Sequence, residues 1–169
     1  MLPKDNLKSR SDILKISAKN GATDGLIIRH MEEKDVKDVA KLAFLSFSEP
    51  WSENAYLQTL SNPLYLSLVA YKEEEFLGFA DVTLVCGEAS LNNIAVKEKY
   101  KQKGVATSLI NTLIDKLKEK GIVSLTLEVR PSNTPAISLY KKLGFKVCGR
   151  RQDFYKKPTE DALILTRKI

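Results

Sequence analysis

The sequence predicts an α/β domain in which helices cover both faces of a central sheet. Short apolar runs of strand length alternate with segments whose apolar residues recur at helical spacing. Their order is strand, two helices, three strands, helix, strand, helix and two strands, which favours such a sheet. At 169 residues, 43% of them hydrophobic and 28% charged, the chain is long enough for one soluble domain with a real core.

The chain divides into two unequal parts. Residues 1–25 have only a weak apolar spacing, which leaves a short accessory helix and a flexible arm equally open, and "KNGATDG" is typical of a linker. We therefore expect an N-terminal arm over residues 1–25 and one domain over residues 26–169.

In the first half of the domain, "LIIRHM" predicts a strand and "EPWSENAYLQTL" a helix with Ser52 as its N-cap. The segment "EEKDVKDVAKLAFLSF" between them predicts a helix. Its apolar positions at helical spacing are Val36, Val39, Ala40, Ala43, Phe44 and Phe47. "YLSLVAY" and "FLGFADVTLV", separated by "KEEE", predict an antiparallel hairpin, and "EASLNNIAV" predicts a further strand.

The second half contains two more helices and three strands. A helix is predicted after Gly104 and ends at Gly121, and "IVSLTLEV" predicts a buried strand. "NTPAISLYKKLGF" predicts a helix that begins near Asn133, with Pro135 in its first turn. "FKVCGRR" and "DALILTRKI" predict the last two strands.

Composition excludes several classes of protein. The sequence has no apolar run near the length of about 18 residues that a membrane span needs, and its first residues lack the apolar core of a secretory signal. We expect a cytoplasmic protein without a membrane partner. Cys86 and Cys148, in or beside apolar segments, match no common metal signature, so buried free thiols are favoured over a disulfide and no metal is expected.

The net charge of +6 is unevenly distributed. Residues 141–169 carry nine basic and three acidic side chains, whereas the central region is slightly acidic. A basic tail could attract RNA or an anionic ligand, but a solvated face is the favoured interpretation, and no specific nucleic acid partner is expected.

The stretch "VKEKYKQKGVATSLI" combines alternating lysines with a lone glycine before a helix. Free backbone N–H groups at a helix start can bind an anion when a small residue lets the ligand approach. On its own this pattern does not separate a phosphate site from a tight turn. Neither the Walker lysine pattern nor the three-glycine dinucleotide fingerprint is present.

Several ordered motifs together resemble the GCN5-related N-acetyltransferase (GNAT) superfamily. Its pyrophosphate loop, [QR]-x-x-G-x-[GA], resembles "KQKGVA" except for the lysine at the first position. The finer resemblance is to bacterial ribosomal-protein alanine N-acetyltransferases. It spans residues 26–169 and is carried by "EPWSE", "NNIAV", "LEVRPSN", "LYKKLGF", "RRQDFY" and "EDALIL". It implies a mixed, mostly antiparallel sheet of about seven strands with about four helices.

The resemblance also implies acetyl-CoA as co-substrate. The strand residues Ile94, Ala95 and Val96 would offer backbone groups to the pantetheine arm, which behaves like an added strand. Asn133 would contact the cofactor, or cap its helix, or both. The pyrophosphate would be held at the helix start by Gln102, Lys103, Gly104, Val105, Ala106 and Thr107.

Two residues are implied as catalytic. Glu128, an acid in an apolar strand, is the expected base for the acceptor amine, and the alternative is a salt bridge with Arg130. Tyr140 in the next helix is the expected acid for the departing thiolate, and the alternative is a tyrosine that only packs on its helix face.

The implied acceptor is the N-terminal alanine amine of a small-subunit ribosomal protein, reached by direct transfer in a ternary complex. Trp51 and Tyr155 are expected near its entrance in view of the resemblance, whereas the position of Trp51 after a proline by itself favours packing under a loop. Three alternatives stay open: a lysine side chain as acceptor, a small-molecule amine, and a non-catalytic acyl-CoA sensor or RNA-associated module.

Overall fold

The computed structural model describes residues 24–169. The predicted N-terminal arm therefore lies outside the described residues, apart from Asp24 and Gly25 at its end. Every other predicted helix and strand is present in the predicted order.

Seven strands form one sheet in the order β1-β2-β3-β4-β5-β7-β6. They are β1 (Leu26–His30), β2 (Tyr65–Lys72), β3 (Glu75–Val85), β4 (Glu88–Val96), β5 (Ser124–Val129), β6 (Lys146–Lys156) and β7 (Thr159–Lys168). Only β4 and β5 pair in parallel, and every other neighbouring pair is antiparallel. The expected mixed, mostly antiparallel sheet is confirmed. Strand β6 is longer than expected, because it continues through "RRQDFYK".

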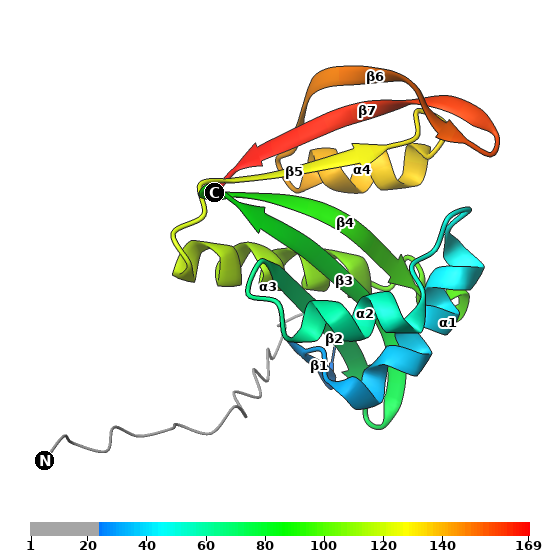
Figure 1. The fold of residues 1–169 in the computed structure, drawn as a ribbon, viewed down its shortest axis with the longest axis vertical. Coiled ribbons are helices and arrows are strands. Elements are labelled where there is room, and N and C mark those ends of the chain that lie inside the picture. The colour runs from blue at the N-terminus through cyan, green and yellow to red at the C-terminus, as the bar shows by residue number, and fades with distance from the viewer. Residues whose placement is uncertain (1–23) are drawn as a thin grey trace, which may run out of the picture.

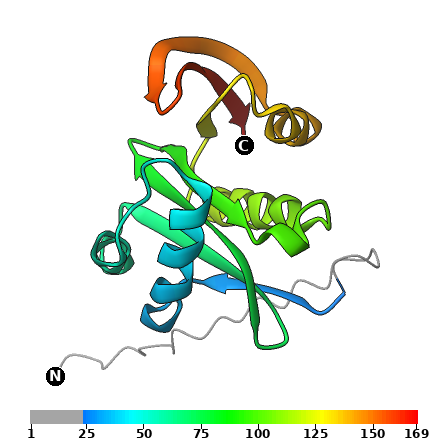
Figure 2. The ribbon, with the colours of Figure 1, turned by 90° about the vertical axis from the view of Figure 1, so that its right-hand side faces the viewer.

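Helices cover both faces of the sheet, as Figures 1 and 2 show. They are α1 (Val36–Ser46), α2 (Glu53–Leu60), α3 (Val105–Glu119) and α4 (Thr134–Lys142), with short 3-10 turns η1 (Glu33–Asp35) and η2 (Glu98–Tyr100). Helices α3 and α4 pack with one hydrophobic cluster, and α1 and α2 pack with a second on the opposite face. Because α3 connects β4 to β5 as a crossover, these two strands run in parallel.

The helix ends follow the predicted chemistry. The Ser52 side chain accepts a hydrogen bond from the N–H of Ala55 at the start of α2. Asn133 caps α4 in the same way, accepting from the N–H of Ala136. Gly121, with φ +72°, follows the last turn of α3, where a residue with a left-handed backbone ends a helix.

Two predictions about burial are wrong. Phe44 is 74% exposed, because it lies about 100° around α1 from Ala43 and away from the sheet-facing stripe, whereas Leu42 is buried. Both cysteines are exposed free thiols. Cys86 lies in the turn between β3 and β4, and Cys148 lies on the outer strand β6, so apolar neighbours in sequence did not imply burial at either place.

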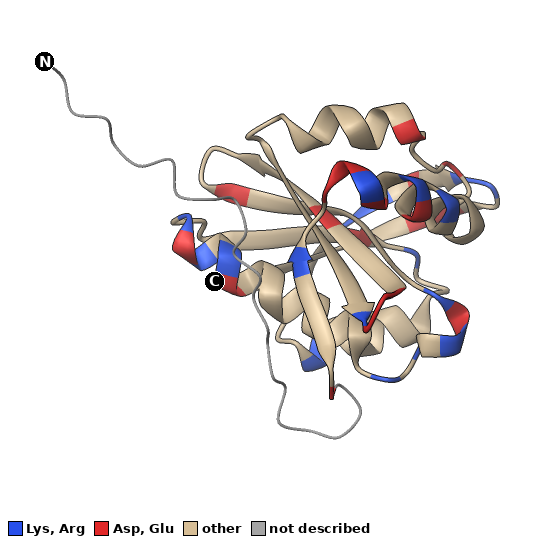
Figure 3. Cartoon of the chain, turned by 90° about the horizontal axis from the view of Figure 1, so that it is seen from below, with Lys and Arg blue, Asp and Glu red and all other residues tan. Residues whose placement is uncertain are grey.

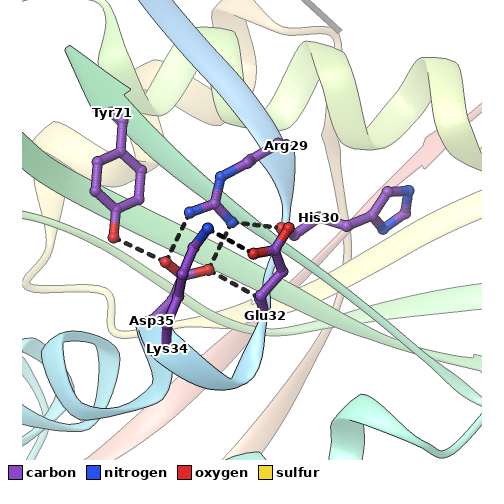
Figure 4. Close-up of polar contacts among 6 residues, drawn as sticks. All are labelled: Arg29, His30, Glu32, Lys34, Asp35 and Tyr71. Carbon is purple, nitrogen blue, oxygen red and sulfur yellow. Dashed lines mark hydrogen bonds and ion pairs between the residues drawn. The ribbon is translucent and has the colours of Figure 1, made fainter. Parts of the chain in front are cut away.

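A buried ion pair attaches the first helix to the sheet (Figure 4). Asp35, fully buried, accepts hydrogen bonds from both guanidinium nitrogens of Arg29 at 2.6 and 2.8 Å and from the hydroxyl of Tyr71 at 2.8 Å. The Glu32 N–H donates to the same carboxylate at 2.8 Å. Burial opposes ionisation of Asp35, but these donors outweigh it and hold the pKa of the carboxyl below its usual value. Strands β1 and β2 are thereby joined to the start of α1.

Replacing Asp35 by Asn should lower the free energy of unfolding by about 3 kcal/mol at pH 7, because Arg29 loses its counter-charge in a site that is largely buried. The ion pair stabilises the fold above the ordinary pKa of a carboxyl, and its contribution is lost as the pH falls through the lowered pKa. The difference between wild type and D35N should therefore narrow in acid, which urea unfolding at several pH values would measure. Lys34→Ala, which breaks an exposed ion pair with Glu32, is the control and should cost less than about 1 kcal/mol.

Candidate active site

The sheet is split between β4 and β5. The two strands pair only from Glu88↔Ser124 to Leu91↔Leu127, and beyond that point they diverge (Figure 1). The register between β3 and β4 shifts at the same level, where Asn92 has no partner in β3. The edge of β4 that faces β5 is therefore open from Asn92 onward.

The open edge carries backbone groups that a ligand can use. The Lys97 N–H donates to the Leu77 carbonyl of β3 at 2.8 Å. Since backbone groups alternate in direction along a strand, those of Val96 and Ile94 point the other way, into the split. Ala95 belongs to the buried cluster beneath α1 and α2. The three residues predicted to line a pantetheine arm thus lie along the mouth of the split.

The start of α3 lies next along the chain and has free N–H groups. Gly104 is the N-cap, with φ +82°, a left-handed conformation that favours glycine, and no side chain of a described residue caps the helix. The first intrahelical bond is donated by Ser108, which leaves the N–H groups of Val105, Ala106 and Thr107 for a ligand. Gln102 also has positive φ, +59°, so the preceding loop turns sharply toward this point.

The lysines before this helix differ in their partners. Lys99 pairs with Glu75 at 2.5 Å and Lys101 with Glu98 at 2.5 Å. Lys97 lies over the ring of Phe76, and Lys103 over that of Tyr100. Lys103 is therefore a cation beside Gly104 with no carboxylate partner among the described residues. Figure 3 shows Lys and Arg interspersed with Asp and Glu over the molecule as seen from below.

Glu128 lies in β5, one residue past the last pair with β4, so its side chain is at the mouth of the split. The alternative role considered for Glu128, a salt bridge with Arg130, is wrong. Arg151 of β6 lies 3.5 Å from the Glu128 carboxylate, whereas Arg130 pairs with Glu160 at 3.2 Å. The Glu128 side chain is 25% exposed, because it points away from the core-facing Leu127. It is accessible to a ligand in the split.

Tyr140 is buried in α4 and packs edge-on against Phe145 at 5.6 Å. Burial, reinforced by the nearby Tyr155, raises its pKa to about 12, so its hydroxyl stays protonated at neutral pH. No described residue accepts a hydrogen bond from it. Tyr140 therefore packs in the core, as the alternative interpretation expected, and also keeps a hydroxyl proton that it could donate.

Tyr155 is held at the site by a network around Arg130. The Arg130 guanidinium stacks over the Tyr155 ring at 4.1 Å and donates to the backbone carbonyls of Lys157 and Pro158. Glu160, which pairs with Arg130, also accepts from the N–H and hydroxyl of Ser132 at 2.7 and 2.9 Å. Burial raises the pKa of Tyr155, Arg130 opposes this, and the charge of Glu128 adds to it. The network joins the β5–α4 loop to the turn between β6 and β7.

Trp51 lies before α2 and packs against Tyr56 at 5.5 Å and Tyr65 at 6.2 Å between ring centroids. It also lines an open surface groove of about 630 Å³ with Phe44 and Pro50. Trp51 is thus packed among aromatic side chains, and its expected place near an acceptor entrance stays a prediction. Asn133 is an N-cap whose side chain is exposed, which leaves it accessible to a ligand at the start of α4.

Sequence reasoning did not single out two residues of this region as functional. Arg130 was considered only as a partner of Glu128, although its position in "LEVRPSN" would have justified asking what else it contacts. Asp81 lies within the apolar segment "FLGFADVTLV" and is fully buried beside the split. The argument applied to Glu128, that an acid in an apolar strand needs a reason, applies equally to Asp81.

A split sheet beside an uncapped helix start, in this order of strands, is the fold of an acetyltransferase. The family model described as "Acetyltransferase (GNAT) family" matches residues 36–145, and the chain belongs to this family.

The similar relatives point to one branch of the family. A protein of Bacillus subtilis named putative [ribosomal protein bS18]-alanine N-acetyltransferase is 35% identical over 82% of this chain and 92% of its own. The Salmonella typhimurium [ribosomal protein bS18]-alanine N-acetyltransferase is 39% identical over 71% of this chain and 82% of its own. The crystal structure of the Escherichia coli ribosomal-protein-S18-alanine N-acetyltransferase has a TM-score of 0.78 and 33% identity, covering 85% of this chain and 94% of that one.

Residues 24–169, the part of the chain that the structure describes, contain neither a candidate membrane-spanning helix nor a candidate metal cluster. None of their helices is both long and apolar enough to cross a membrane. No group of three or more His, Cys, Asp and Glu residues among them is arranged to hold a metal ion.

Gly104→Asp should weaken acetyl-CoA binding at least about tenfold, because the new side chain is strained at φ +82° and brings a negative charge to the helix start. Lys97→Ala should change binding by less than about twofold, since Lys97 lies over Phe76 rather than at Gly104. Isothermal titration calorimetry would measure both. Equal losses in the two variants would contradict an anion site built from the backbone of α3.

Proposed function

We propose that this protein is a cytoplasmic acetyl-CoA-dependent N-acetyltransferase that modifies the N-terminal alanine of ribosomal protein bS18. Residues 26–169 would form its catalytic domain. The observation that carries the proposal is the position of Glu128, whose side chain is partly exposed one residue past the last pair between β4 and β5. Burial raises the pKa of Tyr155 and of Tyr140; the nearby Glu128 adds to the first shift and the nearby Tyr155 to the second. Support for the acceptor comes from the names of the relatives.

The cofactor would lie along the open edge of β4. Its pantetheine arm would exchange hydrogen bonds with the backbone of Ile94 and Val96, and its pyrophosphate would accept from the N–H groups of residues 104–107. Lys103 would add positive charge, and Asn133 would contact the cofactor from the start of α4. The thioester then sits where β4 and β5 begin to part, next to Glu128.

Transfer requires a neutral amine. An α-ammonium group has a pKa near 8, so a carboxylate acting directly or through a water suffices to take its proton at neutral pH. Glu128 is the base, because its side chain is partly exposed at the split and is held there by Arg151. The amine lone pair attacks the thioester carbon and forms a tetrahedral intermediate.

Collapse of that intermediate needs a donor for the oxyanion and a proton for the thiolate. The N–H of Val96 points into the split and can donate to the oxyanion. Tyr140 gives its proton to the sulfur as the C–S bond breaks, and its pKa of about 12 keeps that proton in place beforehand. The nitrogen loses its surplus proton as the amide forms, which restores the protonated Tyr140. The products are the acetylated N-terminus and CoA. Trp51 and Tyr155 would border the path of the acceptor chain.

Glu128→Gln and Tyr140→Phe should each lower kcat on the order of 100-fold or more, because each removes one proton transfer while preserving side-chain volume. Steady-state kinetics would measure this, and thermal melting would verify the fold. Lys141→Ala, on the exposed side of α4 next to Tyr140, is the matched control and should leave kcat unchanged. Unchanged kcat in either folded variant would remove that residue from its role.

The acceptor is tested with a peptide panel. Incubation with acetyl-CoA should acetylate a peptide with a free N-terminal alanine from bS18, and mass spectrometry would place the acetyl group on the α-amine. A peptide with a blocked N-terminus and an internal lysine should remain unmodified. Transfer to that lysine, or to a polyamine, but not to the free alanine would contradict the proposed acceptor while preserving the enzyme class.

A further inference from the structure

Asp81 is a buried carboxylate for which the mechanism above has no use. It lies in β3, is 0% exposed, and makes no ion pair with a described residue. Its hydrogen bonds come from two side-chain amides of β4: Asn92 donates at 3.1 Å, and Asn93 donates to both carboxylate oxygens at 3.2 Å. An unpaired charge is costly in such a place, so its presence needs a reason.

A second buried polar group lies nearby. Tyr56 of α2 is fully buried, and its hydroxyl has no hydrogen-bond partner among the described residues. Burial raises the pKa of Tyr56, and the charge of Asp81 raises it further, which shows that the two groups interact. Burial also raises the pKa of Asp81 to about 7, against the effect of Asn92 and Asn93. Tyr56 is the titratable group that interacts with Asp81.

The carboxylate fixes the orientation of Asn93. The NH₂ group of Asn93 donates to both oxygens of Asp81, so the oxygen of the same amide points away from Asp81. No described residue donates to that oxygen. Asn92 differs, because its amide is also bonded to the Thr83 hydroxyl. Asn93 therefore presents an amide oxygen that accepts no hydrogen bond from a described residue, and its orientation is fixed by the hydrogen bonds to Asp81.

The free oxygen of Asn93 is on the same side of the sheet as Glu128. Along β3, Ala80 and Val82 face the α3 cluster, so Asp81 and its partner Asn93 face the opposite side. Along β5, Leu127 and Val129 face the α3 cluster, so Glu128 also faces the opposite side. The strands that carry Asn93 and Glu128 diverge from the level of Leu91 and Leu127, so the two residues flank the split.

We propose that Asn93, oriented by Asp81, binds the amino group of the acceptor across the split from Glu128. The ligand is a primary amine, whose N–H group donates to the amide oxygen while another faces the Glu128 carboxylate. Asn93 is a substrate-binding residue and Asp81 a positioning residue. The inference rests on the proposed function, since it assigns a contact to the acceptor of that reaction.

The test begins with Asn93→Ala and the bS18 N-terminal peptide. The KM for the peptide should rise about 10- to 100-fold, the range for one hydrogen bond to a charged group, while the Kd for acetyl-CoA changes by less than about twofold. Thr83→Val is the matched control: it removes the partner of Asn92, leaves the Asn93 contacts intact, and should leave both constants unchanged. Wild-type KM in folded N93A would overturn the proposal.

Asp81→Asn separates the positioning role from a structural one. Asp81 Oδ1 accepts from both Asn92 and Asn93, whereas Oδ2 accepts from Asn93 alone, so the NH₂ group that the substitution introduces should take the position of Oδ2. There it faces the NH₂ group of Asn93 and favours the flipped Asn93 amide, so the KM for the peptide should rise as in N93A. The D81N variant should bind the peptide more weakly than the wild type but should itself be more stable. The pKa of Asp81 is raised from 3.8 to about 7, so the wild type loses stability as the pH rises through this range, and D81N should melt higher at pH 8. A D81N protein that melts higher but keeps the wild-type KM would show that the hydrogen bonds of Asp81 only stabilise the register shift between β3 and β4, and would overturn the proposal.

The experiment distinguishes this inference from the proposed function. Wild-type protein that acetylates another amine but not the bS18 peptide would contradict the proposed acceptor, and the variants would then be measured with that amine. Wild-type protein that acetylates no amine would contradict both. Wild-type activity on the bS18 peptide that is unaffected in N93A and D81N would contradict this inference alone.

Discussion

The parting of β4 from β5 is the constraint on which the rest of the structure depends. A sheet gains stability by pairing every strand along its length, and here the pairing stops after four residue pairs. The backbone groups released beyond Leu91 line the space in which the cofactor is proposed to bind. Three features lie around that space: the register shift at Asn92, which has no opposite residue in β3, the uncapped start of α3, and the partly exposed side chain of Glu128.

The two faces of the sheet differ in the helices and side chains that they place around this split. On one face, α3 and α4 bury a continuous hydrophobic cluster and present their N-terminal ends, where Gly104 and Asn133 lie. On the other face, Asp35 and Arg29 attach α1 to the sheet, and Trp51, which precedes α2, packs against Tyr65 of β2. We propose that the first face holds the anionic cofactor and the second borders the acceptor chain.

Much of the fold was accessible from the sequence, because periodicity and capping residues are local. Ser52, Asn133 and Gly121 predicted helix ends correctly, and the order of elements predicted the sheet. The site residues could be nominated through ordered motifs, and their roles remain proposals. Contacts between distant segments were not accessible: nothing local shows that Arg151 reaches Glu128, or that Arg130 reaches Glu160. Nor does the neighbourhood of Cys86 in the chain reveal that it lies in an exposed turn.

An open strand edge is ordinarily a place where another protein can add a strand, and so a starting point for aggregation. The edge beyond Leu91 avoids this by its shape. The gap between β4 and β5 is closed at one end and widens steadily, whereas an incoming polypeptide strand needs about 4.8 Å to each neighbour along its whole length. A slender, flexible molecule can follow such a wedge, but a second protein strand cannot pair with both sides of it. The interrupted sheet thus leaves a space for a slender ligand in which a second protein strand could not complete the pairing on both sides.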